Sequence, residues 1–168
     1  MKEIYLAGGC FWGTEHYLKQ IYGVISTEVG YANGTTEAPT YEEVYTDTTG
    51  YAECVRVVYD PAKITLKLLV ELFFRSIDPL SLNQQGGDCG TRYRTGVYYV
   101  DRSDEGVIEP IFKNVERELG VPLAVELGPL ENFYPAEEYH QDYLEKNPNG
   151  YCHIPLSLMM MAKLANKK

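Results

Sequence analysis

The sequence predicts an α+β fold, a single two-layer domain in which helices cover a mixed β-sheet and long functional loops join them. The chain has 168 residues, the length of one domain, and 45% of them are hydrophobic, an ordinary globular value. Segments with strand character alternate with segments of helical periodicity, and a helical layer over a sheet would cover the apolar faces of both. No internal repeat, low-complexity tract or linker divides the chain, so we expect residues 1–168 to form one domain.

The first half of the chain predicts a strand, a helix, a strand, a long loop, a strand and a second helix. The first strand stops at Gly8-Gly9, and Asp60-Pro61 closes the third, which is rich in β-branched residues. The loop contains six Thr, three Gly and one Pro, and loops of this length are usually functional. Thr65 is the expected N-cap of the second helix. These elements cover residues 4–7, 12–20, 24–29, 30–50, 54–59 and 65–73.

The second half predicts a Gly-rich loop, a strand, a helix, a strand and a final helix. Ser103 is the expected cap of the first of these helices, Pro110 its expected kink and Gly120 its expected end. Pro135 suits the first turn of the final helix, and Asn147-Pro148-Asn149-Gly150 predicts a turn after it. These elements cover residues 78–92, 95–100, 103–118, 122–127 and 136–145.

Composition argues against several kinds of partner. The 15 Lys and Arg stand against 24 Asp and Glu, and this net charge of −9 argues against nucleic acid. No apolar run approaches the roughly 18 to 20 residues of a membrane span. Met1 leads into a strand-like segment with no basic region and no long apolar core, so we expect no secretory signal and a cytoplasmic protein.

Four cysteines are spread along the chain, namely Cys10, Cys54, Cys89 and Cys152. In a chain without a secretory signal they do not predict a disulfide framework. Their spacing matches no zinc knuckle and the three histidines form no HExxH pattern, so we predict no metal site. Two interpretations remain for the cysteines: buried, inert thiols, or redox and nucleophilic chemistry.

Cys10 lies where the first predicted strand passes into the first predicted helix, within the segment Gly-Gly-Cys-Phe-Trp-Gly at 8–13. Free backbone N–H groups and the helix dipole favour an anion there, so we expect a lowered pKa for this thiol. Phe11 and Trp12 could form a pocket for a small apolar group. A small buried cysteine at a tight turn, with both aromatic residues in the core, is an alternative that these residues leave open.

The same junction resembles the signature of a known family. Gly-Cys-Phe-Trp-Gly at 9–13 is similar to the signature of the A-type peptide methionine sulfoxide reductases. Further segments resemble motifs of that family in the family's order, and the similarity runs from about residue 4 to residue 153. These segments are 29–34 with 39–44, 49–53, 57–61, 87–94, 136–144 and 149–152.

The resemblance implies a ferredoxin-like core and a peptide-methionine (S)-S-oxide reductase, a thiol-dependent enzyme that repairs oxidised methionine in proteins and as the free amino acid. Residues 1–168 would then be its single catalytic domain. The implied reductant is an external dithiol, with thioredoxin expected, and no cofactor is implied. Residues 154–168 contain no further cysteine, which implies direct reduction of a disulfide between Cys10 and Cys152. We expect a monomer.

The resemblance also implies a role for each site residue. Cys10 attacks the sulfoxide sulfur, Glu53 protonates the sulfoxide oxygen, and Tyr41 and Tyr93 donate hydrogen bonds to that oxygen. The sulfenic acid left on the nucleophile would be resolved by Cys152.

Three further residues are implied to bind the substrate. Phe11 and Trp12 would hold its methyl group, and Asp88 would position the substrate and its surroundings.

These residue types suit the chemistry, because a sulfoxide has an electrophilic sulfur and an oxygen that leaves poorly. Reduction needs a thiolate on one side and proton donors on the other. A carboxyl group donates near pH 7 only when burial raises its pKa, whereas tyrosine hydroxyls stay protonated and suit a developing oxyanion.

The two remaining cysteines have different expected places. Cys54 follows Glu53 directly, and strand neighbours point to opposite faces, so we predict a core thiol that faces away from the site. Cys89 is either incidental or an auxiliary thiol.

Two alternative functions compete with the reductase. His140 or His153 could serve as the base for Cys10 in a cysteine-nucleophile hydrolase or acyltransferase. The 15 tyrosines could instead form the surface of a non-enzymatic binding module. Turnover separates the three, because only a reductase consumes two thiols for each sulfoxide.

Overall fold

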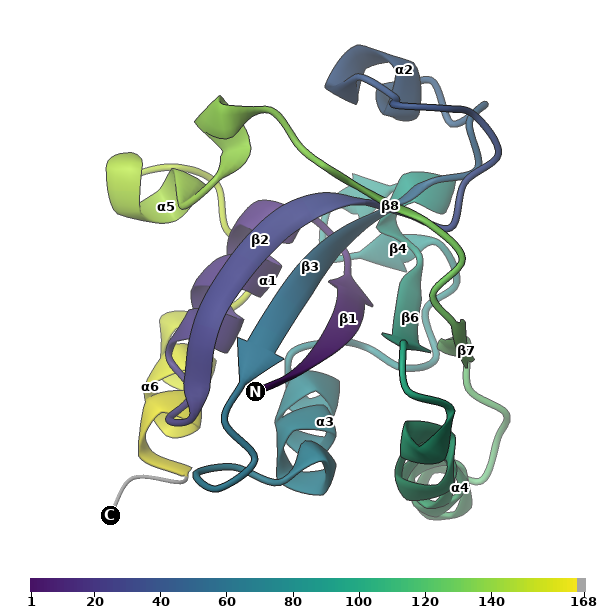
Figure 1. Ribbon diagram of the computed structural model, residues 1–168, viewed down its shortest axis with the longest axis vertical. Coiled ribbons are helices and arrows are strands. Elements are labelled where there is room, and N and C mark those ends of the chain that lie inside the picture. The colour runs from purple at the N-terminus through teal and green to yellow at the C-terminus, as the bar shows by residue number, and fades with distance from the viewer. Residues whose placement is uncertain (166–168) are drawn as a thin grey trace.

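A mixed sheet of six strands runs through the computed structural model, which describes residues 1–165 (Figure 1). Every neighbouring pair is antiparallel except β6 and β7, which are parallel, so the predicted mixed sheet is confirmed. The strand order is β7 (Glu126–Pro129), β6 (Thr95–Tyr99), β1 (Lys2–Gly8), β3 (Ala52–Tyr59), β2 (Val24–Ala32) and β8 (Phe133–Pro135).

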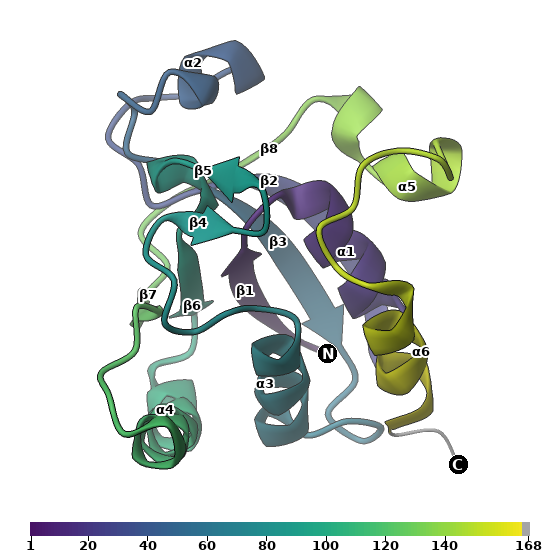
Figure 2. The same cartoon turned by 180° about the vertical axis from the view of Figure 1, so that it is seen from behind.

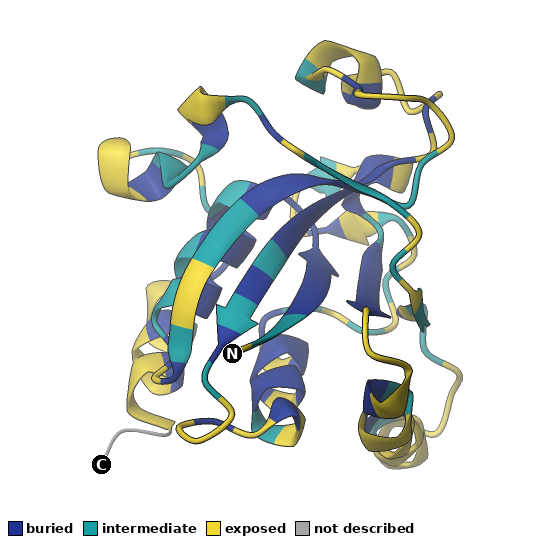
Figure 3. Ribbon diagram, viewed as in Figure 1, coloured by how far each residue is buried: buried dark blue, intermediate teal, exposed yellow. Residues whose placement is uncertain are grey.

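Helices cover one face of this sheet, as Figure 2 shows from behind. They are α1 (Phe11–Lys19), α3 (Leu66–Arg75) and α6 (Leu156–Ala165). A further helix, α4 (Glu105–Leu119), packs beside α3 and lies beyond the lower end of β6 in Figure 1. Part of the opposite face is covered by the segment around Leu130 and Phe133, which packs on a small cluster that includes Tyr5 and Cys54. As a result β1 and β6 are buried along most of their length (Figure 3). None of the helices in the described part of the chain is both long and apolar enough to span a bilayer.

The order of elements around the middle of the sheet is compatible with the implied ferredoxin-like core. The chain runs β1-α1-β2-β3-α3-β6, and these four strands lie side by side in the order β6-β1-β3-β2. The two helices are therefore the crossovers of a β-α-β-β-α-β unit.

The predicted start of α3 is confirmed. The hydroxyl of Thr65 accepts a hydrogen bond of 3.1 Å from the backbone N–H of Leu68, which satisfies one of the free donors at the helix start. The apolar face that follows is buried, with Leu69, Leu72 and Phe73 fully inaccessible to solvent.

The predicted loop at 30–50 contains more structure than we expected. Its first residues continue β2, and a short helix, α2 (Tyr41–Tyr45), lies within it. The side chain of Thr40 accepts a bond from the N–H of Glu43, whose carboxylate accepts one from the N–H of Thr40. This capping box is visible in the sequence as Thr-x-x-Glu and identifies the helix start.

Two predicted boundaries in the second half are wrong. Ser103 does not cap α4, because it lies inside a 3₁₀ turn whose cap is Asp101, and α4 begins at Glu105. The strand predicted at 122–127 lies at 126–129 instead, where it pairs in parallel with β6. The predicted end at Gly120 is confirmed, and this residue has the left-handed φ of 74° that favours glycine.

The final helix predicted at 136–145 is also wrong. Pro135 ends β8, and only two short turns follow, a 3₁₀ turn at Glu138–His140 and α5 (Tyr143–Lys146). Tertiary hydrogen bonds interrupt the helix: the side chain of Gln141 bonds to the backbone N–H and C=O of Val29. The N–H of Asp142, a residue with a φ of 54°, bonds to Glu15. The last described helix is α6, which the sequence analysis did not predict.

Candidate active site

The predicted strand-to-helix junction lies at the end of the sheet where β1 stops and β3 begins. In Figure 1 this is the upper end, beneath α2 and α5 and beside β4 (Gln84–Gln85), which pairs with β5 (Asp88–Cys89). Gly9 has a φ of 90°, and a Cβ there would lie 2.7 Å from the Cβ of Gln85. Glycine is therefore required both by the turn and by the close approach of the β4–β5 hairpin.

Glu53 enters this junction from β3. One of its carboxylate oxygens accepts a hydrogen bond of 3.1 Å from the backbone N–H of Phe11, at the start of α1. The side chain is only 1% exposed, and burial raises the pKa of its carboxyl group to about 8. At neutral pH this carboxyl group is therefore mostly protonated, and it lies against the start of the helix. The protonated form is the one that a proton donor needs.

Cys10 stands at the N-cap of α1, as predicted, but its expected pKa is wrong. Burial raises the pKa of this thiol well above its usual range, and the charge of Glu53 raises it further. The backbone N–H groups of Trp12 and Gly13 lower it, but their effect is smaller than that of burial. Because the thiol is 7% exposed, loss of hydration outweighs the helix N-terminus, and Cys10 is a neutral thiol at rest.

Tyr41 and Tyr93 reach the same place from α2 and from the 3₁₀ turn at Thr91–Tyr93. Burial, together with the nearby Glu53 and Cys10, raises the pKa of both hydroxyls, and that of Tyr93 reaches about 12 although Arg92 lowers it. Both hydroxyls are therefore protonated donors within electrostatic range of the acid and the thiol.

The turn that carries Tyr93 is held by Arg92. Its guanidinium lies 4.4 Å from the centre of the Tyr93 ring and forms a salt bridge of 2.8 Å with Asp47. The backbone N–H of Arg92 also donates to Asp47, so two bonds from one residue fix the turn.

Phe11 and Trp12 differ in their surroundings. Phe11 is buried, with its ring centre 5.8 Å from that of Tyr31 and 5.2 Å from that of His140. Trp12 is half-buried and lies flat on Tyr143, with ring centres 3.8 Å apart and an angle of 9° between the planes.

Residues to which the sequence assigned no such role hold these aromatic rings. The indole N–H of Trp12 donates a bond of 2.9 Å to Nδ1 of His140, whose ring lies 4.5 Å from that of Tyr41. Glu137 accepts bonds from the backbone N–H of Tyr41 and from the hydroxyl of Tyr31. His140 and Glu137 both lie in the 136–144 motif. The resemblance therefore identified this segment, but not the contacts that its residues make.

Asp88 faces the site from the β4–β5 hairpin. Its charge raises the pKa of Cys10 and that of the nearby Tyr151. One of its carboxylate oxygens, Oδ2, is buried and has no hydrogen-bond partner in the described part of the chain, so it is available to a bound molecule.

Cys152 lies against the first turn of α1. Its Sγ is 3.4 Å from the backbone oxygen of Ile154, and a Cβ placed on Gly13 would lie 3.1 Å from Sγ. Both Cys10 and Cys152 are free thiols in this structure. All eight predicted site residues therefore lie around the N-terminus of α1.

A model of the peptide methionine sulfoxide reductase family matches residues 2–168. The chain belongs to this family. It is 54% identical over 159 residues to the peptide methionine sulfoxide reductase MsrA of Clostridium acetobutylicum, covering 95% of this chain and 98% of that one. The reduced form of Mxr1 from Saccharomyces cerevisiae matches with a TM-score of 0.87 and 41% identity, over 92% of this chain and 91% of that one. Mxr1 in complex with Trx2 matches with a TM-score of 0.57 and 28% identity, over 84% of each chain.

The resemblance stated from the sequence is thus confirmed, and the enzyme is an oxidoreductase of the MsrA type. Neither of the two histidines considered as bases for a hydrolase is hydrogen-bonded to Cys10 in the described part of the chain. His140 accepts from Trp12, and Nε2 of His153 lies 2.9 Å from the backbone oxygen of Gly8.

The other two cysteines of the reductase lie outside this group of site residues. Cys54 is fully buried in the cluster on the opposite face of the sheet, as its place next to Glu53 predicts. Cys89 is exposed on β5. Residues 1–165 contain no group of His, Cys, Asp and Glu side chains arranged to hold a metal ion.

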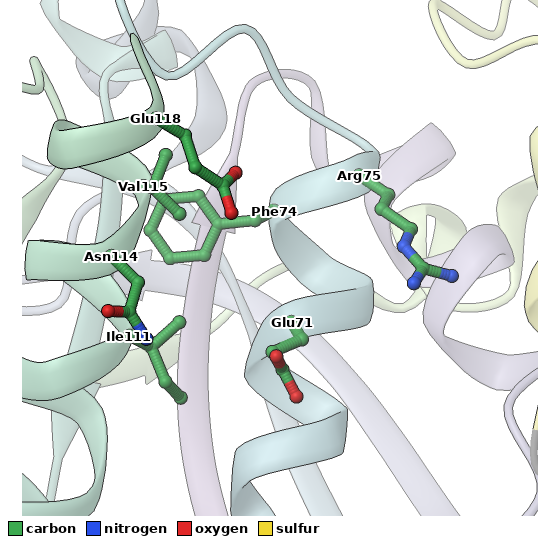
Figure 4. A pocket seen from close by; sticks show the side chains of 7 residues that line it. All are labelled: Glu71, Phe74, Arg75, Ile111, Asn114, Val115 and Glu118. Atoms are coloured by element: carbon green, nitrogen blue, oxygen red, sulfur yellow. The ribbon is translucent and has the colours of Figure 1, made fainter. Parts of the chain in front are cut away.

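Two hollows of similar size differ in their relation to the site. One of about 340 Å³ lies between α3 and α4 and contains none of the site residues (Figure 4). Another of about 380 Å³ lies between α5 and α6, with Leu144, Ile154 and Met159 in its wall, and Cys152 also lines it. The candidate resolving thiol is therefore open to an approaching molecule.

Proposed function

We propose that this reductase acts on the S epimer of methionine sulfoxide, in proteins and as the free amino acid, with residues 1–168 as its single catalytic domain. One observation carries the proposal: a buried, protonated Glu53 is held at the start of α1 beside the thiol of Cys10. A thiol, an acid and two tyrosine hydroxyls form the set that transfer of a sulfoxide oxygen needs.

In the first step Glu53 protonates the sulfoxide oxygen while Cys10 attacks the sulfur. Tyr41 and Tyr93 donate hydrogen bonds to the oxygen as its negative charge develops. The carboxylate that Glu53 becomes then accepts the proton that the Cys10 thiol loses, which suits a thiol that is neutral at rest. The attack joins the sulfur of Cys10 to the substrate sulfur. When the hydroxyl oxygen then passes to Cys10, this sulfur–sulfur bond and the sulfur–oxygen bond of the substrate both break, which leaves a sulfenic acid and free methionine, so the step needs no other reactant.

Substrate binding is assigned to the aromatic residues and to Asp88. Trp12 presents a ring fixed by stacking on Tyr143 and by the bond to His140, and Phe11 provides a second apolar surface for the methyl group. The unpartnered oxygen of Asp88 is an acceptor for a polar group of the substrate or for water around it.

Recycling would use Cys152 and an external dithiol. Cys152 condenses with the sulfenic acid to form a disulfide, which thioredoxin then reduces by exchange. The match to Mxr1 in complex with Trx2 supports this partner, and the hollow beside Cys152 supports access for it. The cycle must regenerate both free thiols, so a reducing compartment such as the cytoplasm suits it. One chain supplies both cysteines, so the cycle needs no second copy of the chain.

We expect the purified enzyme with dithiothreitol to consume methionine S-sulfoxide and to leave the R epimer, because each epimer has its own type of reductase. The measurement is methionine release from each pure epimer, followed by chromatography. Equal consumption of both epimers would contradict the proposed specificity, and hydrolysis of thioesters without consumption of thiol would favour the hydrolase instead.

Replacing Cys152 by serine should stop turnover with thioredoxin while leaving one methionine released per enzyme. The first step does not involve this thiol, but without it the sulfenic acid on Cys10 has no resolving partner. The measurement compares methionine released per enzyme with and without thioredoxin. Cys89→Ser is the matched control and should behave like the wild type; if the two variants exchanged behaviour, Cys89 would be the resolving thiol.

A further inference from the structure

We infer that His153 is the general base that removes the proton of Cys152 when the disulfide with Cys10 forms. The inference rests on the proposed function, because it deepens the resolving step that is assigned there to Cys152.

The two ring nitrogens of His153 have different surroundings. Nε2 lies 2.9 Å from the backbone oxygen of Gly8, and because a carbonyl oxygen can only accept, Nε2 carries the ring proton. In the neutral ring Nδ1 then has a free lone pair. This nitrogen is buried and has no hydrogen-bond partner among the described residues. A buried acceptor is normally paired, so an unused one next to a reactive segment indicates a transient partner.

The free nitrogen and both thiols of the cycle converge on Gly13. The backbone N–H of Gly13 acts on the thiol of Cys10, whose pKa it lowers. A Cβ on the same residue would lie 2.9 Å from Nδ1 of His153 and 3.1 Å from Sγ of Cys152. Because Gly13 has no side chain, Nδ1 and Sγ can both lie this close to α1, and Cys152 moves past Nδ1 when it turns toward Cys10.

The segment that carries these residues can supply this movement. It joins α5 to α6 and crosses over α1 (Figure 2), after a turn in which the N–H of Gly150 donates to Asn147. The thiol of Cys152 is held there by one weak bond to the oxygen of Ile154 at 3.4 Å. Its rotation toward Cys10 breaks that bond, and Nδ1 of His153 then accepts the thiol proton instead.

The charges around the two groups suit a transfer in this direction. Burial raises the pKa of Cys152 above its usual range, so the thiol is protonated at pH 7 and needs a base. Burial lowers the pKa of His153 and leaves the ring neutral and able to accept a proton, while its bond to Gly8 and the facing charge of Asp88 oppose this effect. Asp88 also stabilises the imidazolium once it forms.

The step is balanced without any further reactant. The proton of Cys152 passes to Nδ1 of His153, and the thiolate attacks the sulfur of the Cys10 sulfenic acid. A sulfur–sulfur bond forms, the sulfur–oxygen bond breaks, and the departing hydroxide takes the proton back from the imidazolium to leave as water. The two thiols together have lost the two electrons that the sulfoxide gained, and they end as one disulfide.

The test is a single turnover of the reduced enzyme without external reductant, comparing the wild type with His153→Gln. Glutamine keeps an N–H that can donate to the oxygen of Gly8 but has no basic lone pair, and His16→Gln on α1 is the matched control. Three quantities are followed between pH 6 and 9: methionine released, sulfenic acid trapped with dimedone, and disulfide found by mass spectrometry.

We expect His153→Gln to release methionine at the wild-type rate, to accumulate sulfenic acid, and to form the disulfide about 100-fold more slowly at pH 7. Its slow step should accelerate about tenfold per pH unit as hydroxide ionises Cys152, whereas the wild-type rate changes far less. Disulfide formation at the wild-type rate, or slowed equally at every pH, would overturn the inference. If the wild type released methionine but formed no Cys10–Cys152 disulfide, the proposed role of Cys152 would fail by a separate readout.

Discussion

Replacing Cys10 by serine is expected to abolish methionine sulfoxide reduction, with a loss of at least about 10,000-fold in kcat/KM. A serine hydroxyl at the start of α1 is a far weaker nucleophile toward sulfur, and it cannot carry the oxygen as a sulfenic acid. The measurement is methionine formation with dithiothreitol, together with trapping of sulfenic acid in a single turnover. Retained activity in this variant would remove the proposed mechanism.

Cys54→Ser is the matched control for this prediction. Cys54 lies beside Glu53 in sequence but on the opposite face of the sheet, so the same exchange should leave activity close to that of the wild type. Burying a hydroxyl there costs about 1 to 3 kcal/mol of stability, so thermal unfolding of both variants should be recorded alongside activity. A loss of activity in folded Cys54→Ser would show that a cysteine outside the site also affects the reaction, and the loss in Cys10→Ser would then not identify the nucleophile.

Glu53→Gln should reduce kcat/KM by about 100- to 10,000-fold, the usual contribution of a general acid. The amide oxygen of glutamine can still accept the hydrogen bond from the N–H of Phe11, so the start of α1 is kept while the acid is removed. Binding of the substrate should change little, so the loss is expected mainly in kcat. A loss confined to KM would indicate that Glu53 only positions the substrate.

The acid also predicts how activity depends on pH. The pKa of Glu53 is raised from 4.5 to about 8, so the group is protonated below pH 8 and ionised above it. Since the protonated form is the active one, wild-type kcat/KM should fall about tenfold for each pH unit above 8. This decline should be absent from Glu53→Gln, and its persistence there would assign the titration to another group.

Secondary structure was predicted correctly where the local sequence and the tertiary contacts favour the same element. Thr65 caps α3 through its own hydroxyl, and Gly120 ends α4 through its own φ, so each depends on one residue and its neighbours. The predicted helix at 136–145 failed because Gln141 and Asp142 bond to other parts of the chain, to Val29 and Glu15. No pattern within ten residues contains those partners.

The same distinction holds at the active site. The sequence alone determined the family, the eight candidate residues and the opposite orientations of Glu53 and Cys54, because motifs and strand alternation are properties of the chain. Only the tertiary structure decided the protonation states. Burial makes Cys10 a neutral thiol although its place at a helix start predicts the reverse, and burial makes Glu53 an acid at neutral pH. The physical reason is that a pKa depends on how much water surrounds a group, and it is the assembled fold that excludes the water.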